Sequence, residues 1–268
     1  MKVTLITGAS AGIGEAFANR LAREKHNLLL VSRSEDKLQK LCGELQTQYG
    51  IMAQYIAVDL MQAGSDKIIF EETQKHSLQV NWLINNAGIG SGGDLLEYDL
   101  KSITDMMHLN MDNMVALVHR FLPQMRASKS GKIINVGSMA GFMPIPYMNV
   151  YAATKAFVKS FTEALWEENR LFNIQVMLLC PGATETNFFE AAKIGADRKS
   201  SFSTKKLETS EDVVTSAIKG LHNNNRVTIS GQQNKIIHSV LRFLGPFIPQ
   251  GLILKGYGNK MRKELKYN

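Results

Sequence analysis

Tyr151 and Lys155 lie at positions i and i+4 of the stretch YAATK, so a helix would carry both side chains on one face. A free phenol has a pKa of about 10, and a free lysine stays protonated at neutral pH. An ammonium about 4 Å from the phenolic oxygen would attract the phenolate by roughly 4 kcal/mol and lower the tyrosine pKa by about three units. Such a tyrosine could act as a general acid or base. The same spacing also occurs in plain surface pairs, so the interpretation depends on the rest of the chain.

A glycine-rich stretch, TGASAGIG, follows the first predicted strand and opens a helix. Glycines at positions 8, 12 and 14 allow a tight turn and let the backbone approach a pyrophosphate, while the start of the helix offers unpaired N–H groups. Glycines gather in any tight turn between a strand and a helix, but the position after the first strand is the one that nucleotide binding requires. The stretch therefore predicts a dinucleotide-binding turn.

The elements that must position these residues alternate along the chain. Strands are expected at 3–8, 27–33, 51–60, 81–88, 131–138, 173–182 and 225–231. Helices are expected at 12–26, 35–50 with Ser34 as its N-cap, 65–76, 100–128, 149–170 and 210–223. Strands that are apolar throughout indicate a parallel sheet covered on both faces. We expect one α/β domain over residues 1–231, a doubly wound Rossmann fold with a seven-stranded parallel sheet and helices on both faces. Residues 232–268 would form a basic and apolar extension packed on it.

The composition excludes several classes of protein. The chain has 268 residues, of which 44% are hydrophobic and 21% charged, as in ordinary globular proteins. Cys42 and Cys180 lie far apart, which supports neither a disulfide framework nor a zinc or other metal site. The first residues have no signal-peptide pattern, so we expect a cytoplasmic protein. Seven Lys and Arg against one acid after residue 230 account for +6 of the net charge of +7. The nearly neutral remainder argues against nucleic-acid binding.

Seven separated motifs resemble, in their order, the short-chain dehydrogenase/reductases of the compact, single-domain type. They are TGASAGIG (7–14), VDL (58–60), NNAG (85–88), LN (109–110), NVGSMAG (135–141), YAATK (151–155) and PGATET (181–186). The resemblance covers about residues 1–231 and implies hydride transfer between a nicotinamide cofactor and a carbonyl or alcohol carbon.

The resemblance also implies a role for each of four catalytic residues. Tyr151 would donate the proton to the carbonyl oxygen, and Lys155 would tune the phenol and bind the nicotinamide ribose. Ser138 would hold the substrate oxygen. Asn110 would interrupt its helix and hold a water that links Lys155 to solvent. The chain departs from the family at Gly137, where relatives usually carry the first of two serines.

The cofactor-binding residues follow from the resemblance in the same way. They are Gly8, Ser10, Ala11, Gly12, Ile13, Gly14, Ser32, Arg33, Ser34, Asp59, Leu60, Asn86, Ala87, Gly88, Tyr151, Lys155, Pro181, Gly182, Thr184 and Thr186. The tip of the second strand has no acid to bind both ribose hydroxyls of NAD, and Arg33 could bind a 2′-phosphate. A solvated strand-end arginine is the alternative. Many NADP-using relatives carry a second basic residue where this chain has Ala11. We favour NADP(H) over NAD(H).

Three variable stretches would form the substrate pocket: residues 139–150, a lid at 187–202, and the C-terminal extension. Methionines in the first stretch suit an adaptable apolar wall, although core packing or a subunit contact would explain them equally. We see no fixed polar partners for a small charged substrate, so an apolar ketone or a long acyl chain is favoured. The extension is too interrupted to span a bilayer. Helices that cap the cleft or a subunit interface are favoured for it over contact with an anionic membrane surface.

The leading hypothesis is an NADPH-dependent carbonyl reductase that reduces a ketone or aldehyde of an apolar substrate. The VSRS strand end and the extension resemble the branch near hydroxysteroid and 3-ketoacyl reductases. An alcohol dehydrogenase working oxidatively at the same site is the first alternative. A cofactor-binding sensor or scaffold without turnover ranks lower, because the tyrosine, lysine and serine are all present. Relatives commonly form homodimers or homotetramers through the helices predicted at 100–128 and 149–170.

Overall fold

The computed structural model describes residues 1–188, 207–244, 251, 254–256, 258–259 and 262. Its strands are β1 (Lys2–Thr7), β2 (Leu28–Ser32), β3 (Ala53–Ala57), β4 (Gln79–Asn85), β5 (Gly131–Val136), β6 (Ile174–Cys180) and β7 (Val227–Ile229). Its longer helices are α1 (Gly12–Arg23), α2 (Glu35–Tyr49), α3 (Ser65–Lys75), α4 (Leu100–Met107), α5 (Asn113–Ser128), α6 (Asn149–Asn169), α8 (Ser210–His222) and α9 (Gln232–Leu244). Short helical turns are η1 (Leu95–Glu97), η2 (His108–Asp112), η3 (Met139–Phe142) and η4 (Arg170–Phe172).

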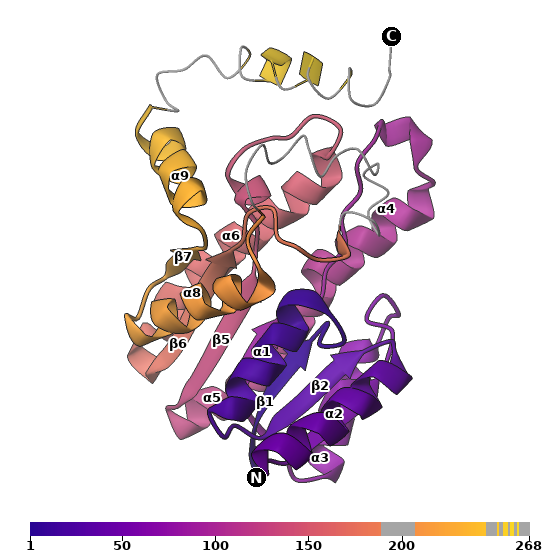
Figure 1. The fold of residues 1–268 in the computed structure, drawn as a ribbon, viewed down its shortest axis with the longest axis vertical. Coiled ribbons are helices and arrows are strands. Elements are labelled where there is room, and N and C mark those ends of the chain that lie inside the picture. The colour runs from indigo at the N-terminus through magenta and orange to yellow at the C-terminus, as the bar shows by residue number, and fades with distance from the viewer. Residues whose placement is uncertain (189–206, 245–250, 252–253, 257, 260–261, 263–268) are drawn as a thin grey trace.

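The seven strands form one parallel sheet in the order β3-β2-β1-β4-β5-β6-β7 (Figure 1). The chain winds outward from β1 to β3, then crosses back to place β4 on the other side of β1. This change of direction leaves a crevice at the carboxyl ends of β1 and β4, which is where doubly wound sheets bind their ligands. The predicted fold class is therefore confirmed, down to the number of strands.

Both faces of the sheet are buried, which explains why the strands are apolar at successive positions. Ile6 and Ile84 point into a core cluster shared with α1, α2 and α8. The preceding residues, Leu5 and Leu83, point into a second cluster shared with α3, α5 and α6. Because neighbouring side chains of a strand face opposite sides of the sheet, helices on both faces demand apolar residues throughout.

Several predicted elements differ in detail from the structure. The expected strand 81–88 ends at Asn85, because the next amides bind the Thr7 hydroxyl instead of a neighbouring strand. The expected helix 100–128 is divided by the π-helical turn η2, as the role of Asn110 required. Ser34 is the N-cap residue of α2, as predicted, but its side chain makes no capping hydrogen bond, and its own amide donates to Ser32 Oγ at 3.3 Å.

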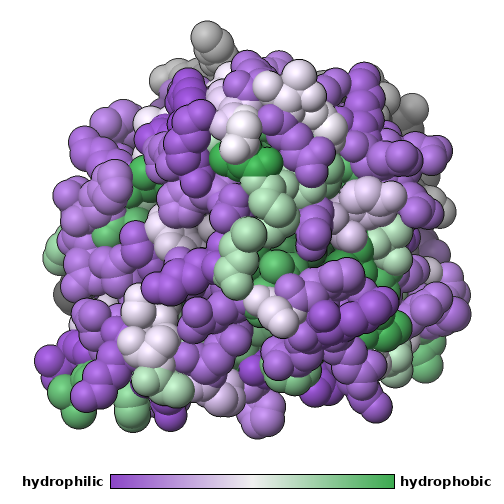
Figure 2. All heavy atoms as spheres, turned by 90° about the horizontal axis from the view of Figure 1, so that it is seen from below, coloured by the Kyte–Doolittle hydropathy of each residue, from purple (hydrophilic) through white to green (hydrophobic). Residues whose placement is uncertain are grey.

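The end of the molecule that holds the N-terminus lies opposite this crevice. Hydrophilic residues cover most of that face, and apolar residues show only between them (Figure 2). Among the residues that the structure describes, no helix is both long and apolar enough to cross a membrane. A ligand-binding site is expected at the opposite end, where the carboxyl ends of the strands lie.

Candidate active site

The glycine turn between β1 and α1 is packed so closely that side chains would not fit. A Cβ on Gly8 would lie 2.9 Å from Asn86 Nδ2, and a Cβ on Gly14 would lie 2.2 Å from the Gly8 carbonyl oxygen. Gly8 and Gly12 also have positive φ angles of 65° and 59°, which favour glycine. Ala11 at the start of α1 has no side chain that could cap it, so the first amides of the helix remain available to an anion. These features fit the pyrophosphate of a dinucleotide.

Thr7 joins this turn to the end of β4, a role that the sequence analysis missed. Its hydroxyl oxygen accepts from the amides of Asn86 and Ala87, both at 3.0 Å. The Asn86 side-chain amide donates in turn to the carbonyls of Thr7 and Gly8 at 2.9 and 3.2 Å. Thr7 stands first in the TGASAGIG motif, so the sequence marked its position but not this function. The hydrogen bonds of Thr7 and Asn86 thus hold together the ends of β1 and β4, which border the crevice.

Asn110 lies in the π-helical turn η2, where burial leaves its side chain 3% exposed. Its Oδ1 accepts from the Ile89 amide at 3.0 Å, and its Nδ2 donates to the Ile89 carbonyl at 2.9 Å and to Thr154 Oγ1 at 3.1 Å. A Cβ on Gly88 would lie 3.1 Å from Asn110 Oδ1 and 3.5 Å from Lys155 Nζ. Asn110 thus connects the chain after β4 to α6 and lies beside Lys155.

Tyr151 lies in the first turn of α6 and is 7% exposed. Its hydroxyl lies near the side chain of Ser138, which follows β5. Ser138 Oγ also accepts from the Ala140 amide at 3.1 Å, which holds the serine side chain in place. The tyrosine ring packs against Phe188 with the ring centroids 5.4 Å apart. The structure therefore brings the predicted serine and tyrosine together from separate elements.

Lys155 is buried next to this pair but does not act on the phenol as the helical spacing suggested. Its Nζ donates to the Val136 carbonyl at 2.9 Å and lies 5.9 Å from the centroid of the Tyr151 ring. Burial raises the pKa of Tyr151 to about 12, and the interaction with Ser138 opposes this only in part. Burial also lowers the pKa of Lys155 to about 8. The expected lowering of the tyrosine pKa by the ammonium is not seen in this arrangement, where burial is the largest influence on the phenol.

The depressed pKa of Lys155 predicts a pH-dependent stability. Between about pH 8 and 10.5 the unfolded chain binds more protons at this lysine, so the free energy of unfolding rises with pH across that interval. The Lys155→Met variant cannot gain stability in this way, because methionine does not titrate. We therefore expect its free energy of unfolding, relative to that of the native protein, to fall by about 3 kcal/mol from pH 7.5 to 10.5. Urea unfolding at several pH values measures it. Lys40→Met at an exposed position is the control, and a difference that does not change with pH would contradict the prediction.

The tip of β2 presents an uncompensated positive charge. Arg33 is exposed, and within the described part of the chain it forms no ion pair or side-chain hydrogen bond. Glu35 is the first acid after Arg33 in the sequence. Its Oε1 lies 3.5 Å from the Tyr55 hydroxyl on the neighbouring strand β3. Ser32 is buried and accepts from the Ser34 amide. The residues here can therefore receive a 2′-phosphate.

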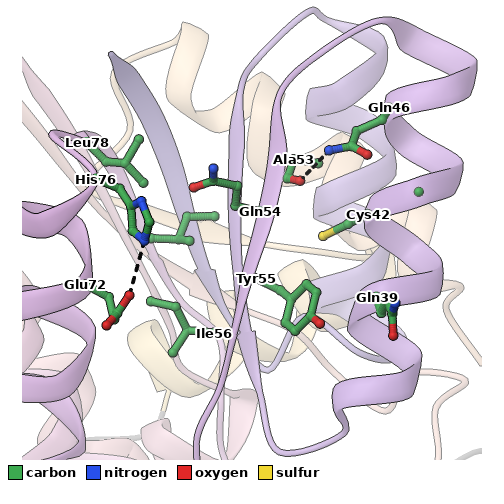
Figure 3. A pocket seen from close by; sticks show the side chains of 12 residues that line it. Gln39, Cys42, Gln46, Ala53, Gln54, Tyr55, Ile56, Glu72, His76 and Leu78 are labelled. Atoms are coloured by element: carbon green, nitrogen blue, oxygen red, sulfur yellow. Dashed lines mark hydrogen bonds and ion pairs between the residues drawn. The ribbon is translucent and has the colours of Figure 1, made fainter.

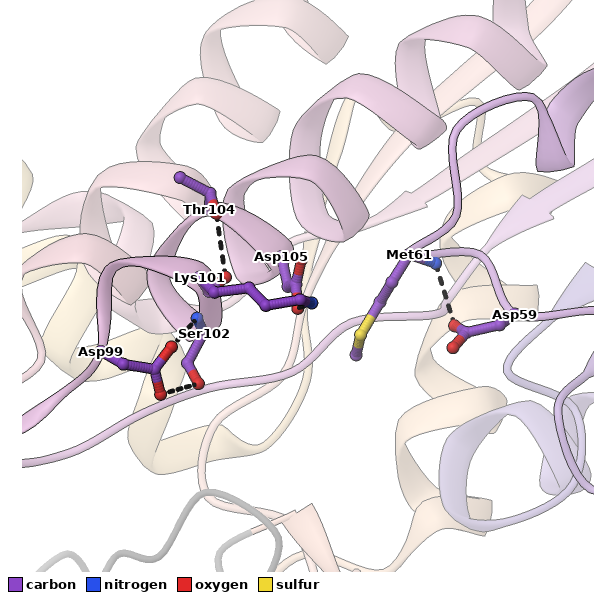
Figure 4. A network of polar contacts seen from close by, with 7 residues as sticks. All are labelled: Asp59, Met61, Asp99, Lys101, Ser102, Thr104 and Asp105. Carbon is purple, nitrogen blue, oxygen red and sulfur yellow. Dashed lines mark hydrogen bonds and ion pairs between the residues drawn. The ribbon is translucent and has the colours of Figure 1, made fainter.

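The loop after β3 and the start of α4 lie next to each other (Figure 4). Asp59 Oδ1 accepts from the Met61 amide at 3.0 Å, which shapes the turn predicted to contact adenine. Leu60 is 4% exposed and packs in the core, so only its backbone could meet a nucleotide. Lys101 reaches toward this turn from α4 while it pairs with Asp105. The sequence analysis missed Lys101, because α4 is distant in the chain and carries no motif there.

The segment after β6 closes the site from the other side. The Pro181 carbonyl accepts from the Met139 amide at 3.0 Å, and Thr184 Oγ1 donates to the Gly182 carbonyl at 3.1 Å. A Cβ on Gly12 would lie 3.0 Å from the Thr186 side chain, so this segment reaches the glycine turn. The predicted lid at 187–202 lies outside the described residues apart from its first two. Of the remaining predicted contacts, Ser10, Ala11 and Ile13 belong to the turn and the start of α1, and Ala87 follows the end of β4.

The predicted pocket wall at 139–150 divides into two parts. Met143, Ile145 and Met148 pack in a cluster with Tyr151, on the side where a substrate would lie. Met139 and Phe142 pack instead against Val158, Leu178 and Cys180, so they belong to the core. The extension also reaches this region, because Arg262 Nε donates to the Tyr147 hydroxyl at 3.0 Å.

A second hollow, of about 540 Å³, lies between α2, β3 and α3, away from the strand ends (Figure 3). Its polar side chains are largely occupied: His76 lies 3.4 Å from Glu72, and Gln46 donates to the Ala53 carbonyl at 2.9 Å. None of the predicted catalytic or cofactor-binding residues lines it. We therefore place the site at the crevice and not in this hollow.

Comparison with known proteins identifies the family. Residues 2–196 match the family model for short chain dehydrogenases. The chain is 30% identical over 268 residues to the very-long-chain 3-oxoacyl-CoA reductase of Rattus norvegicus, covering 96% of this chain and 80% of that enzyme. The chain therefore belongs to the short-chain dehydrogenase family, as the motifs predicted.

Two solved structures are similar over nearly the whole chain. A short-chain dehydrogenase from Sphingobium yanoikuyae in complex with NADPH is 28% identical with a TM-score of 0.80, covering 93% of this chain and 97% of that one. A 7beta-hydroxysteroid dehydrogenase studied for its stereoselectivity is 26% identical with a TM-score of 0.85, covering 96% of both chains. The chain is accordingly an oxidoreductase of this family with the nicotinamide-binding Rossmann fold.

Proposed function

We propose that this protein uses NADPH to reduce the ketone of an apolar substrate, with a 3-ketoacyl thioester as the leading class. The observation that carries the proposal is that the Tyr151 hydroxyl lies near Ser138 and that Tyr151 packs in a cluster of apolar side chains. A phenol that keeps its proton can donate it to a carbonyl oxygen bound at the same place. Two relatives named above support this substrate class. Their names, 3-oxoacyl-CoA reductase and hydroxysteroid dehydrogenase, indicate ketones or alcohols of apolar molecules as substrates.

Each residue of the site has one task in this reaction. The nicotinamide cofactor supplies the hydride when it is bound. Ser138 holds the substrate oxygen, and Tyr151 gives it a proton as negative charge develops there. The raised pKa of Tyr151 suits the reducing direction, because the hydroxyl stays protonated across the physiological range. Lys155 lies behind the tyrosine, and its lowered pKa of about 8 suits a group that returns the proton from solvent.

The preference for NADPH rests on Arg33 and its surroundings. The guanidinium can make charge-assisted hydrogen bonds to a 2′-phosphate, whereas NADH offers it no charge. The Glu35 carboxylate interacts with the Tyr55 hydroxyl and forms no ion pair with Arg33. The relative from Sphingobium yanoikuyae, which was solved with NADPH, supports the same choice.

Replacing Arg33 should weaken binding of NADPH selectively. We expect Arg33→Ala to raise the Kd for NADPH by roughly 10- to 100-fold, because hydrogen bonds to charged groups contribute about 1.5–3 kcal/mol. The Kd for NADH should change by less than about threefold. Fluorescence titration with both cofactors measures these values. Arg23→Ala, which removes the same charge from the far end of α1, is the control. Equal weakening of both cofactors would show that Arg33 does not read the phosphate.

The proposed activity can be tested directly on the purified protein. NADPH oxidation is followed by absorbance with a panel of medium- and long-chain 3-ketoacyl thioesters, steroid ketones and small polar ketones. Turnover that rises with the apolar length of the substrate would support the proposal. Tight NADPH binding without turnover on any ketone would favour a cofactor-binding sensor, and turnover of small polar ketones alone would contradict the apolar pocket.

A further inference from the structure

Helix α9 carries an apolar face that no described residue covers. Ile236, Ile237, Val240 and Phe243 are 64%, 50%, 44% and 69% exposed. They lie at positions i, i+1, i+4 and i+7, which a helix gathers on one side. We call these four residues the α9 stripe. Large apolar side chains that gather on one exposed face usually mark a surface that binds something.

The opposite side of α9 is fixed to the body of the protein, so the stripe must face outward. His238 packs edge-on against Phe142 with the ring centroids 4.6 Å apart. Asn234 Nδ2 donates to the Ser230 carbonyl at 2.9 Å. Figure 1 shows α9 projecting from the body at the end opposite the N-terminus, well away from the hydrophilic face of Figure 2. The stripe is thus held in a fixed direction at the end where the strands carry the active site.

A cationic groove runs along the flank of the same helix. Lys219, Arg226, Lys235 and Arg242 line the space of about 650 Å³ between α8, β7 and α9, and no carboxylate is among the described residues that line it. Glu163 lies nearby and pairs with Arg226 at 3.4 Å. The groove therefore keeps a positive charge directly beside the apolar stripe.

We propose that α9 docks this protein on the surface of an anionic phospholipid bilayer. A helix with an apolar face and basic residues on its flank lies in the membrane interface, with the apolar side chains among the acyl chains and the cations at the lipid phosphates. The sequence from residue 231 onward carries seven Lys and Arg against one acid, which complements such a surface. A second copy of the chain fits less well, because a symmetric contact would bring two cationic grooves together. The sequence alone favoured a capping helix, but the uncovered stripe reverses that preference for α9.

Vesicle binding of the full chain tests the proposal. The protein is sedimented with phosphatidylcholine vesicles and with vesicles that also contain about a third phosphatidylglycerol. We expect binding to the anionic vesicles only, weakened by salt. Ile236→Ser/Phe243→Ser should reduce the bound fraction at least about tenfold, since it removes the apolar insertion. Ile68→Ser/Leu171→Ser removes two exposed apolar side chains from α3 and η4 and should bind as the native protein does.

A second pair of variants tests the cationic flank. Lys235→Gln/Arg242→Gln should weaken binding to anionic vesicles, whereas Lys40→Gln/Lys67→Gln, with the same change in net charge on α2 and α3, should not.

Circular dichroism and NADPH affinity confirm that every variant is folded. Absence of binding to either vesicle, or equal loss in the control variants, would overturn the proposal. So would a dimer in analytical ultracentrifugation that Ile236→Ser/Phe243→Ser dissociates, because the stripe would then be a subunit interface. Vesicle binding needs no turnover, so this result is independent of the proposed activity.

Discussion

Tyr151→Phe should lower kcat for ketone reduction by about a thousandfold or more while leaving cofactor binding nearly unchanged. The substitution removes only the hydroxyl that lies near Ser138 and would donate the proton. Proton donation by a positioned side chain contributes roughly 10²–10⁴ in rate. The phenylalanine ring keeps the apolar contact with Phe188, so the pocket should retain its shape. Steady-state kinetics with NADPH and the best ketone, together with a cofactor titration, measure both effects.

A matched control separates this effect from loss of any tyrosine hydroxyl. Tyr55 lies on β3 and not among the residues around Ser138, Tyr151 and Lys155, and its hydroxyl is 3.5 Å from a Glu35 oxygen. Tyr55→Phe should therefore leave kcat within about twofold of the native value, as is usual for surface changes. If Tyr151→Phe kept more than a tenth of the native kcat, another group would have to be the proton donor.

Gly14→Ala should abolish cofactor binding and lower the free energy of unfolding by more than about 2 kcal/mol. Alanine usually stabilises a helix relative to glycine by about 1 kcal/mol, so helix propensity alone predicts a gain. Here the added Cβ would lie 2.2 Å from the Gly8 carbonyl oxygen and 2.7 Å from Asn86 Nδ2. The start of α1 must therefore move away from the end of β1, and overpacking of this kind costs about 1–3 kcal/mol. Urea unfolding and NADPH titration measure the two losses.

Gly43→Ala provides the opposite result in the same protein. Gly43 lies within α2, and a Cβ there would meet nothing within 4 Å. We expect Gly43→Ala to raise the free energy of unfolding by about 0.5–1 kcal/mol without changing NADPH affinity. A stabilising effect of Gly14→Ala, equal to that of Gly43→Ala, would mean that the turn can relax and that its close packing is not required.

Much of the fold could be predicted because the central strands are buried on both faces and are therefore apolar at successive positions. The apolar runs that contain Leu5 and Ile6, or Leu83 and Ile84, follow directly from helices on both sides of the sheet. Strand ends were less predictable, because they depend on partners far away in the chain. β4 stops at Asn85 only because the Thr7 hydroxyl, on another strand, takes the next two amides.

The identity of the site residues could be predicted from motifs, but their interactions could not. A spacing of four residues places Lys155 and Tyr151 on one face of α6, yet it cannot say that the ammonium turns to the Val136 carbonyl. It also cannot estimate burial, which is the largest influence on both pKa values. Lys101 and Thr7 were missed for the same reason, since their roles exist only where distant segments meet.

The sheet order has a consequence for how the protein is made. β1 leaves the ribosome well before β4, which begins at Gln79, yet β1 is a central strand and β4 is one of its two neighbours. The glycine turn gains its final shape only when the end of β4 supplies Asn86. Until then β1 presents an unpaired edge, which other chains could pair with. Non-local pairing of this kind slows folding, so recovery of cofactor binding after denaturation should lag behind recovery of helix content.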